Sequence, residues 1–166
     1  MLDLMIMLIL VTFLVLVVTV VVFVYISGIS TSMEFTFSSN IPYLKNGATF
    51  YYRPYKGSYT AVGPLFTEAY SLTPKFCQCG LYYNDPDNEP PENCRAAIGV
   101  LLDDGSEEDI SALEYNGFKK FHIPPIKEAL YAPFPHISFL SVFIGIFKAL
   151  PLLRKRFKVF SYTLWI

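Results

Sequence analysis

The hydrophobic residues of this chain are concentrated in a long N-terminal segment, and the remainder alternates between apolar and polar positions. Residues 4–26 carry no charge, and 18 of these 23 residues are Leu, Ile, Val or Phe. A helix of that length rises about 34 Å, which is enough to cross a hydrocarbon core of about 30 Å. The pattern therefore predicts a transmembrane helix over residues 1–26.

A cleaved signal peptide is the alternative interpretation of this segment, since Gly28, Ile29 and Ser30 resemble a cleavage site. Signal peptides begin with basic residues, whereas this chain has Asp3, and its apolar run is about twice the usual length. The first basic residue after the segment is Lys45. Because basic residues favour the cytosolic side, the chain is expected to cross once and to place its C-terminal part in the cytosol.

Beyond the apolar segment, residues 27–46 are rich in Ser and Thr and predict a flexible tether. Residues 47–166 then form one domain, because about 120 residues support a single core. Helical spacing, caps and turn residues predict helices over 63–73, 106–116 and 137–153. Strands are expected over 48–52, 80–83, 95–102, 118–123, 128–131 and 158–166.

The helix over 137–153 is apolar enough that a second membrane span is an alternative. Small and basic residues fall on one side at helical spacing: Ser138, Ser141, Gly145, Lys148 and Lys155. The opposite side carries Ile137, Leu140, Phe143, Ile144, Phe147 and Leu150. Lys148 limits the uncharged run to 11 residues, which favours an amphipathic helix whose apolar side is core.

The predicted order of strands and helices places the chain in the α+β class, and several motifs carry a resemblance to a known family. They are the runs over 65–75, Tyr82-Tyr83-Asn84-Asp85-Pro86, Pro90-Pro91-Glu92-Asn93-Cys94-Arg95-Ala96-Ala97-Ile98-Gly99, Gly117-Phe118-Lys119-Lys120-Phe121 and Phe134-Pro135. In this order, and after an N-terminal span, the chain resembles the testis-expressed protein 264 family from about Gly47 to Leu153.

The resemblance implies a single-pass endoplasmic reticulum protein with a cytosolic gyrase-inhibitor-like domain of two strand-helix-strand-strand repeats. It further implies a receptor or adaptor for autophagy of the reticulum (reticulophagy). The implied partners are GABARAP-type autophagy modifiers, a valosin-containing ATPase and a DNA-protein crosslink protease. The second repeat is expected to be incomplete, because its last strand is missing, and the family's acidic tail with the modifier-binding motif is expected to be absent.

A carboxylate beside aromatic rings is the candidate ligand site that the sequence offers. In gyrase-inhibitor-like domains such a site between the repeats meets cationic or planar ligands. Glu68, Tyr52, Tyr82 and Tyr131 are the candidates, and the alternative function is a membrane-tethered small-molecule sensor. The plainer interpretation makes Glu68 a solvated helix residue and the tyrosines core residues.

Charge and cysteine content narrow the remaining function classes. The net charge of −1 gives no basic excess for nucleic-acid binding, so none is expected. No spacing typical of a metal site or a catalytic pair is found among Cys77, Cys79, Cys94, His122 and His136. The sequence therefore predicts no bound metal, no cofactor and no enzymatic activity. A basic cluster of Arg154, Lys155, Arg156 and Lys158 complements a helix end and is also a candidate for contact with membrane lipid.

Overall fold

The chain is mixed α and β, with a long apolar helix followed by a domain that contains a sheet, as the sequence predicts. The computed structural model describes residues 2–157 and divides them into two compact units. Unit 1 comprises residues 2–36 and 130–157, and unit 2 comprises residues 37–129. The predicted strand over 158–166 lies outside the described residues.

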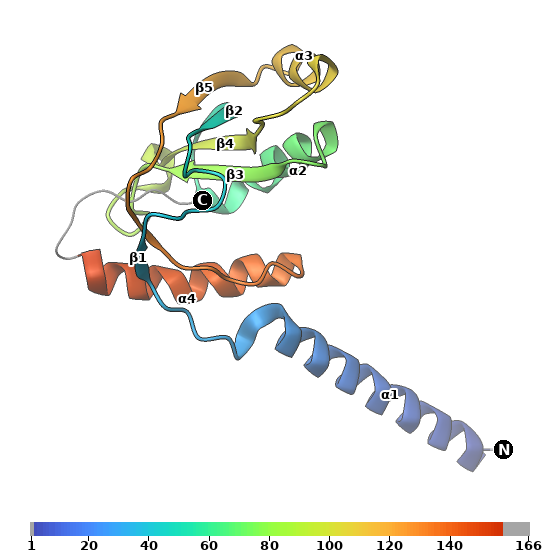
Figure 1. Ribbon diagram of the computed structural model, residues 1–166. Helices are drawn as coiled ribbons and strands as arrows, with labels where there is room; N and C mark the ends of the chain where they lie inside the picture. Colours follow the sequence, from blue (N-terminus) through green and yellow to red (C-terminus); the bar gives the residue numbers. More distant parts are fainter. Residues whose placement is uncertain (1, 158–166) are drawn as a thin grey trace. The chain divides into compact units, whose positions relative to one another are not determined.

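Unit 1 begins with the helix α1 (Leu2–Val24), drawn in blue in Figure 1, which continues into a π-helical turn, η1 (Tyr25–Ile29). The two threonines of α1 bond its own backbone: the hydroxyls of Thr12 and Thr19 donate to the carbonyls of Leu8 and Val15, both at 2.8 Å. No polar group of these side chains is therefore left for lipid to solvate. Among the described residues, this is the one helix long and apolar enough to cross a membrane.

The second long helix, α4 (Phe139–Phe157), also belongs to unit 1 and contacts η1. The prediction that its apolar side is core is wrong for much of that side, because Ile137 and Phe147 are 60% and 75% exposed. The small-residue side is buried instead, with Ser141 only 1% exposed. This side was expected to face solvent. It is buried because its small residues allow η1 to approach closely.

The segment over 27–46 contains more structure than the predicted tether. Its first residues belong to η1, and β1 (Thr36–Ser38) pairs with β6 (Ala129–Tyr131). Ile41 and Leu44 are buried, and the carbonyl of Leu44 accepts a hydrogen bond from the amide of Ile126 at 3.2 Å. The globular part therefore begins several residues before Gly47.

Unit 2 is built on a four-stranded antiparallel sheet in the order β3-β4-β2-β5. The strands are β2 (Ala48–Lys56), β3 (Cys77–Tyr82), β4 (Arg95–Leu101) and β5 (Lys119–Ile123). The helices α2 (Gly63–Leu72) and α3 (Glu107–Tyr115) cover one face, the helix face. Two short 3-10 helices, η2 (Tyr59–Ala61) and η3 (Pro91–Asn93), lie in the connections.

Local sequence explains both helices of unit 2. Pro64 lies in the first turn of α2, where its missing N–H costs no hydrogen bond. α3 begins with a capping box: the hydroxyl of Ser106 accepts from the amide of Asp109, whose carboxylate accepts from the amide of Ser106. The helices enclose the main core with the sheet, and its buried members are Tyr51, Ala69, Val100, Leu102, Leu113 and Phe118.

β2 is longer than predicted and continues through Arg53 and Pro54 to Lys56. Its pairing with β5 ends at Tyr52, so among the described strands the rest of β2 pairs only with β4. A proline is tolerated there because no described strand needs an N–H donor on the side of β2 away from β4. The additional residues bring Lys56 opposite Arg95 of β4.

Candidate functional site

A row of polar and aromatic side chains crosses the sheet on the face opposite the helices. Lys56 in β2 is the antiparallel partner of Arg95 in β4. The amide of Tyr83, directly after β3, donates to the carbonyl of Arg95 at 3.0 Å. Because cross-strand partners project from the same face, Lys56, Arg95 and Tyr83 form a three-residue row, the basic row.

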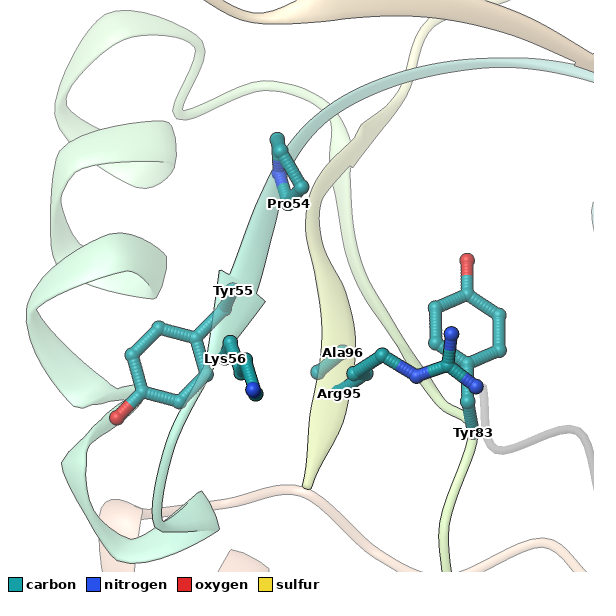
Figure 2. A pocket seen from close by; sticks show the side chains of 6 residues that line it. All are labelled: Pro54, Tyr55, Lys56, Tyr83, Arg95 and Ala96. Carbon is teal, nitrogen blue, oxygen red and sulfur yellow. The ribbon is translucent and has the colours of Figure 1, made fainter. Parts of the chain in front are cut away.

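The basic row lines a surface hollow of about 570 Å³, which Pro54, Tyr55 and Ala96 complete. Figure 2 shows the Arg95 side chain extending alongside the ring of Tyr83, with Lys56 on the neighbouring strand. The ring of Tyr55 points the other way, toward α2, and its hydroxyl donates to the carbonyl of Ser58 at 3.0 Å. The charged wall of the hollow therefore comes from Lys56 and Arg95.

The hairpin between β3 and β4 is fixed by hydrogen bonds that hold the backbone of Arg95 in place. The side-chain oxygen of Asn84 accepts from the amide of Arg95 at 3.0 Å. The Tyr59 hydroxyl lies 2.9 Å from the carbonyl oxygen of Arg95 and accepts from the amide of Asn84 at 3.1 Å. These bonds give the Tyr-Tyr-Asn motif a physical role, since its asparagine positions the arginine of the basic row.

The electrostatics of the basic row favour an anion. Like charges directly opposite each other on neighbouring strands repel. Arg53 and Glu68 form the one ion pair recorded among the described residues, so no acidic side chain within residues 2–157 is recorded as an ion-pair partner of Lys56 or Arg95. An anion between the two cations would relieve their repulsion and would accept hydrogen bonds from the guanidinium group.

A smaller hollow of about 130 Å³ adjoins the basic row on the same face, and Tyr83 contributes to both. The other lining residues are Phe50, Tyr52, Leu81, Ala97 and Phe121. The rings of Phe50 and Tyr52 stack with their centroids 5.5 Å apart. The two hollows together offer cations beside flat apolar surface, which is an arrangement suited to a planar anionic molecule.

The structure separates the ligand-site residues that the sequence suggested. Glu68 lies on α2 over the helix face, where both carboxylate oxygens accept from Nη1 of Arg53 at 2.5 and 2.6 Å. Tyr82 packs into the core with its ring edge-on to Tyr59 at 4.8 Å. Tyr52 lines the smaller hollow, and Tyr131 lies in β6. Lys56 and Arg95 were missed, because the strand containing Lys56 was expected to end at Tyr52.

The basic cluster suggested for membrane contact begins in the last turns of α4. The backbone at Arg154, Lys155 and Arg156 is helical, and Lys158 lies outside the described residues. The assignment of these four residues to lipid contact stays a prediction.

Burial suppresses ionisation of the thiols and tyrosines along β3. Desolvation, with a smaller contribution from Cys77, raises the pKa of Cys79 to about 12. Desolvation also raises the pKa of Cys77. These two thiols are therefore protonated at neutral pH and poor nucleophiles. Within residues 2–157, no group of three or more His, Cys, Asp or Glu side chains is placed to hold a metal ion.

The tyrosines around the hairpin are held neutral for the same reason. Burial raises the pKa of Tyr82 to about 12, with Tyr59 and Cys79 adding to the effect. Burial also raises the pKa of Tyr59, against the lowering effect of its backbone hydrogen bond with Asn84. For Tyr83, burial and then Tyr52 raise the pKa, whereas Arg95 lowers it. Tyr83 thus presents a neutral hydroxyl to the hollow at physiological pH.

These shifts predict that unit 2 loses stability in alkali. Tyr82 ionises near pH 10 when unfolded but near pH 12 when folded, so the unfolded state binds fewer protons between these values and is favoured as the pH rises. The expected loss is about 2 kcal/mol between pH 10 and pH 12. Pulse proteolysis of the full chain in detergent measures it, and Tyr82→Phe should flatten the decline. Equal slopes for both proteins would contradict the assignment.

Comparison with known proteins identifies relatives of the chain. No protein-family model matches it, and no solved structure matches it. Over 123 residues, 72% of the chain, it is 36% identical to the testis-expressed protein 264 homolog of Mus musculus. It is 34% identical to testis-expressed protein 264 of Homo sapiens over the same length. The chain spans about two fifths of these curated relatives, 39% and 38% of their lengths.

Proposed function

Because the chain belongs to the testis-expressed protein 264 family, we propose that it is a membrane-anchored receptor or adaptor for autophagy of the endoplasmic reticulum. α1 anchors it by a single span, and unit 2 faces the cytosol. GABARAP-type autophagy modifiers and a valosin-containing ATPase are its proposed partners. The observation that carries the proposal is the joining of a membrane-length apolar helix to a domain matched by these relatives.

Three features of the chain support this proposal. α1 has an uninterrupted apolar surface, with its large side chains mostly 40–60% exposed, as lipid contact requires. The first basic residues after α1 are those of the globular part, beginning with Lys45, which favours the cytosolic side for it. The described thiols Cys77, Cys79 and Cys94 are all free, in keeping with a reducing compartment.

Delivery of the chain to lysosomes tests the receptor proposal. The full chain would carry a tandem fluorescent reporter whose acid-sensitive half is lost in lysosomes, and cells would be starved to induce autophagy. We expect acid-processed signal in normal cells and background signal in cells without GABARAP-type modifiers. Processing that is absent, or that persists without the modifiers, would contradict the proposal.

The basic row favours a second candidate function, binding of a small planar anion by unit 2 beneath the membrane. The specific observation is the hollow of about 570 Å³ with Lys56 opposite Arg95 and the neutral ring of Tyr83 beside them. The ligand expected here is an anion and not the cation that Glu68 suggested, because Glu68 is paired with Arg53 on the other face of the sheet. A charged planar ligand would place its anion between the cations and its ring against the tyrosine.

Thermal-shift measurements on the detergent-solubilised chain distinguish the two kinds of ligand. Planar aromatic carboxylates and phosphates are expected to raise the melting temperature, and hydrophobic cations are not. Arg95→Gln should weaken binding about tenfold, since a charge-assisted hydrogen bond contributes about 1.5 kcal/mol or more. Lys127→Gln, outside the hollow, is the matched control. Equal binding by both variants, or a response to cations alone, would contradict the site.

A further inference from the structure

One side of α4 presents large apolar side chains that unit 1 does not bury. Val142, Ile146 and Phe147 are 41%, 45% and 75% exposed. Spacings of one and four residues place them on one side of a helix. These three residues form the apolar face of α4. A face of this kind is unfavourable in water and indicates contact with another apolar phase.

The opposite side of α4 packs against the chain that immediately follows α1. Oγ of Ser138 lies 3.0 Å from Oγ of Ser27, and both serines belong to unit 1. A Cβ added at Gly28 would lie 2.7 Å from the Phe134 ring, and one added at Gly145 would lie 3.1 Å from the same ring. Two glycines therefore accommodate one aromatic ring, which joins α4 to the end of the anchor.

Lys148 hydrogen-bonds the middle of α4 to the residues that follow α1. Its ammonium group donates to the carbonyl oxygens of Gly28 at 3.0 Å and Thr31 at 2.8 Å, and to that of Ile29. Carbonyls at the C-terminal end of a helix lack partners within the helix and carry partial negative charge, so a cation is well placed there. The contact fixes α4 next to the residues at which α1 leaves the hydrocarbon.

We propose that α4 lies in the membrane interface as an amphipathic helix, with its apolar face among the lipid acyl chains beside the exit point of α1. The proposal rests on the membrane anchoring by α1 in the proposed function. The occupant of the apolar face is then the bilayer that α1 already crosses. Helices of this kind bury their apolar side about 5–10 Å into the boundary between headgroups and acyl chains.

Length and charge explain why α4 lies along the interface rather than across the membrane. The uncharged run over 137–147 is 11 residues, whereas a span requires about 20. Lys148 ends that run, and Arg154, Lys155 and Arg156 follow within the same helix. Basic residues next to an apolar face fit anionic headgroups above the acyl chains. A protein partner or a second copy of the chain would not require this arrangement at the exit point of α1.

Photocrosslinking to lipid tests the proposal in the full chain. The photoreactive amino acid p-benzoylphenylalanine would replace Phe147, Phe13 or Tyr115 one at a time, in chains reconstituted into phosphatidylcholine vesicles that contain an alkyne-tagged lipid. Phe13 lies in α1 and reports on the anchor. Tyr115 is 93% exposed in the acidic helix α3 and is the control for an exposed aromatic away from lipid. All three positions are exposed aromatics, so the substitution disturbs no core.

The positions that form lipid adducts distinguish failure of the interfacial helix α4 from failure of the anchor α1. We expect adducts at Phe13 and Phe147, with about tenfold more at Phe147 than at Tyr115, because an apolar face immersed in acyl chains meets lipid continuously. Adducts at Phe13 with a Tyr115-like yield at Phe147, or crosslinks of Phe147 to protein instead of lipid, would overturn the interfacial helix alone. Absence of lipid adducts at Phe13 would overturn the anchor and the interfacial helix together.

Discussion

Replacement of Gly99 by Ala is expected to destabilise unit 2 by about 3 kcal/mol, the upper end of the usual cost of overpacking a core. A Cβ at this position would lie 1.8 Å from the carbonyl oxygen of Tyr51 and 2.8 Å from Cα of Tyr52. Both atoms are backbone, so no side chain can rotate away. β2 would have to separate from β4, and these are the two inner strands of the sheet.

Pulse proteolysis of the detergent-solubilised full chain across a urea series measures this loss in the free energy of unfolding. Gly63→Ala is the matched control, because a Cβ at Gly63 has no atom within 4 Å. That change should leave the stability unaltered or raise it by about 0.5–1 kcal/mol, since alanine favours a helix over glycine. If Gly99→Ala were as stable as Gly63→Ala, the close approach of β2 and β4 would be wrong.

Two arginines in the middle of α1 are expected to release the chain from membranes. Leu14 and Val18 lie near the centre of the helix and are 62% and 53% exposed. Each arginine costs about 2.5–3.5 kcal/mol and removes an apolar contribution of about 0.5 kcal/mol. The combined change of about 6–8 kcal/mol is comparable with the whole driving force for insertion of a segment like this one.

Carbonate extraction of cell membranes measures that release. The variant with Leu14→Arg and Val18→Arg should move from the membrane pellet to the supernatant. The matched variant with Leu14→Ala and Val18→Ala should remain in the pellet, because alanine is nearly neutral toward insertion and α1 retains its other apolar residues. An arginine variant that stayed in the pellet would mean that α1 is not what holds the chain there.

The helices of unit 2 were predictable because their signals are local. Pro64 near the start of α2 and the Ser106–Asp109 capping box of α3 depend on neighbouring residues only. The end of β2 was not predictable in the same way. Arg53 and Pro54 resemble a break in the strand, and they are tolerated because β5 stops pairing at Tyr52. Where β5 stops pairing depends on the arrangement of the whole sheet and cannot be read from any short run of sequence.

The candidate site was missed for the same reason. The strand that contains Lys56 was expected to end at Tyr52, so the position of Lys56 opposite Arg95 could not be foreseen. Glu68 and Tyr82 were suggested from their chemistry, but a carboxylate or a phenol in the sequence does not reveal its side of the sheet. Strand alternation places Tyr52 and Tyr83 on one face only once the pairing of β2 and β3 with β4 is known, and the sequence does not reveal that register.

α4 shows a limit of hydrophobic periodicity. The spacing identified one apolar and one small-residue side, and the structure buries Ser141 of the second while leaving Phe147 of the first exposed. Periodicity reports that a helix has two unlike sides, but lipid and protein core are both apolar. Only the contact of Lys148 with the carbonyls after α1 indicates which of these phases the apolar face meets.

The proposed topology, in which the chain crosses the membrane once through α1 with unit 2 on the cytosolic side, can be measured by protease protection. Intact microsomes would carry the full chain with a different epitope tag at each end. We expect protease to remove the C-terminal tag without detergent and the N-terminal tag to survive until detergent is added. Loss of both tags without detergent, or survival of the C-terminal tag, would contradict the proposed topology.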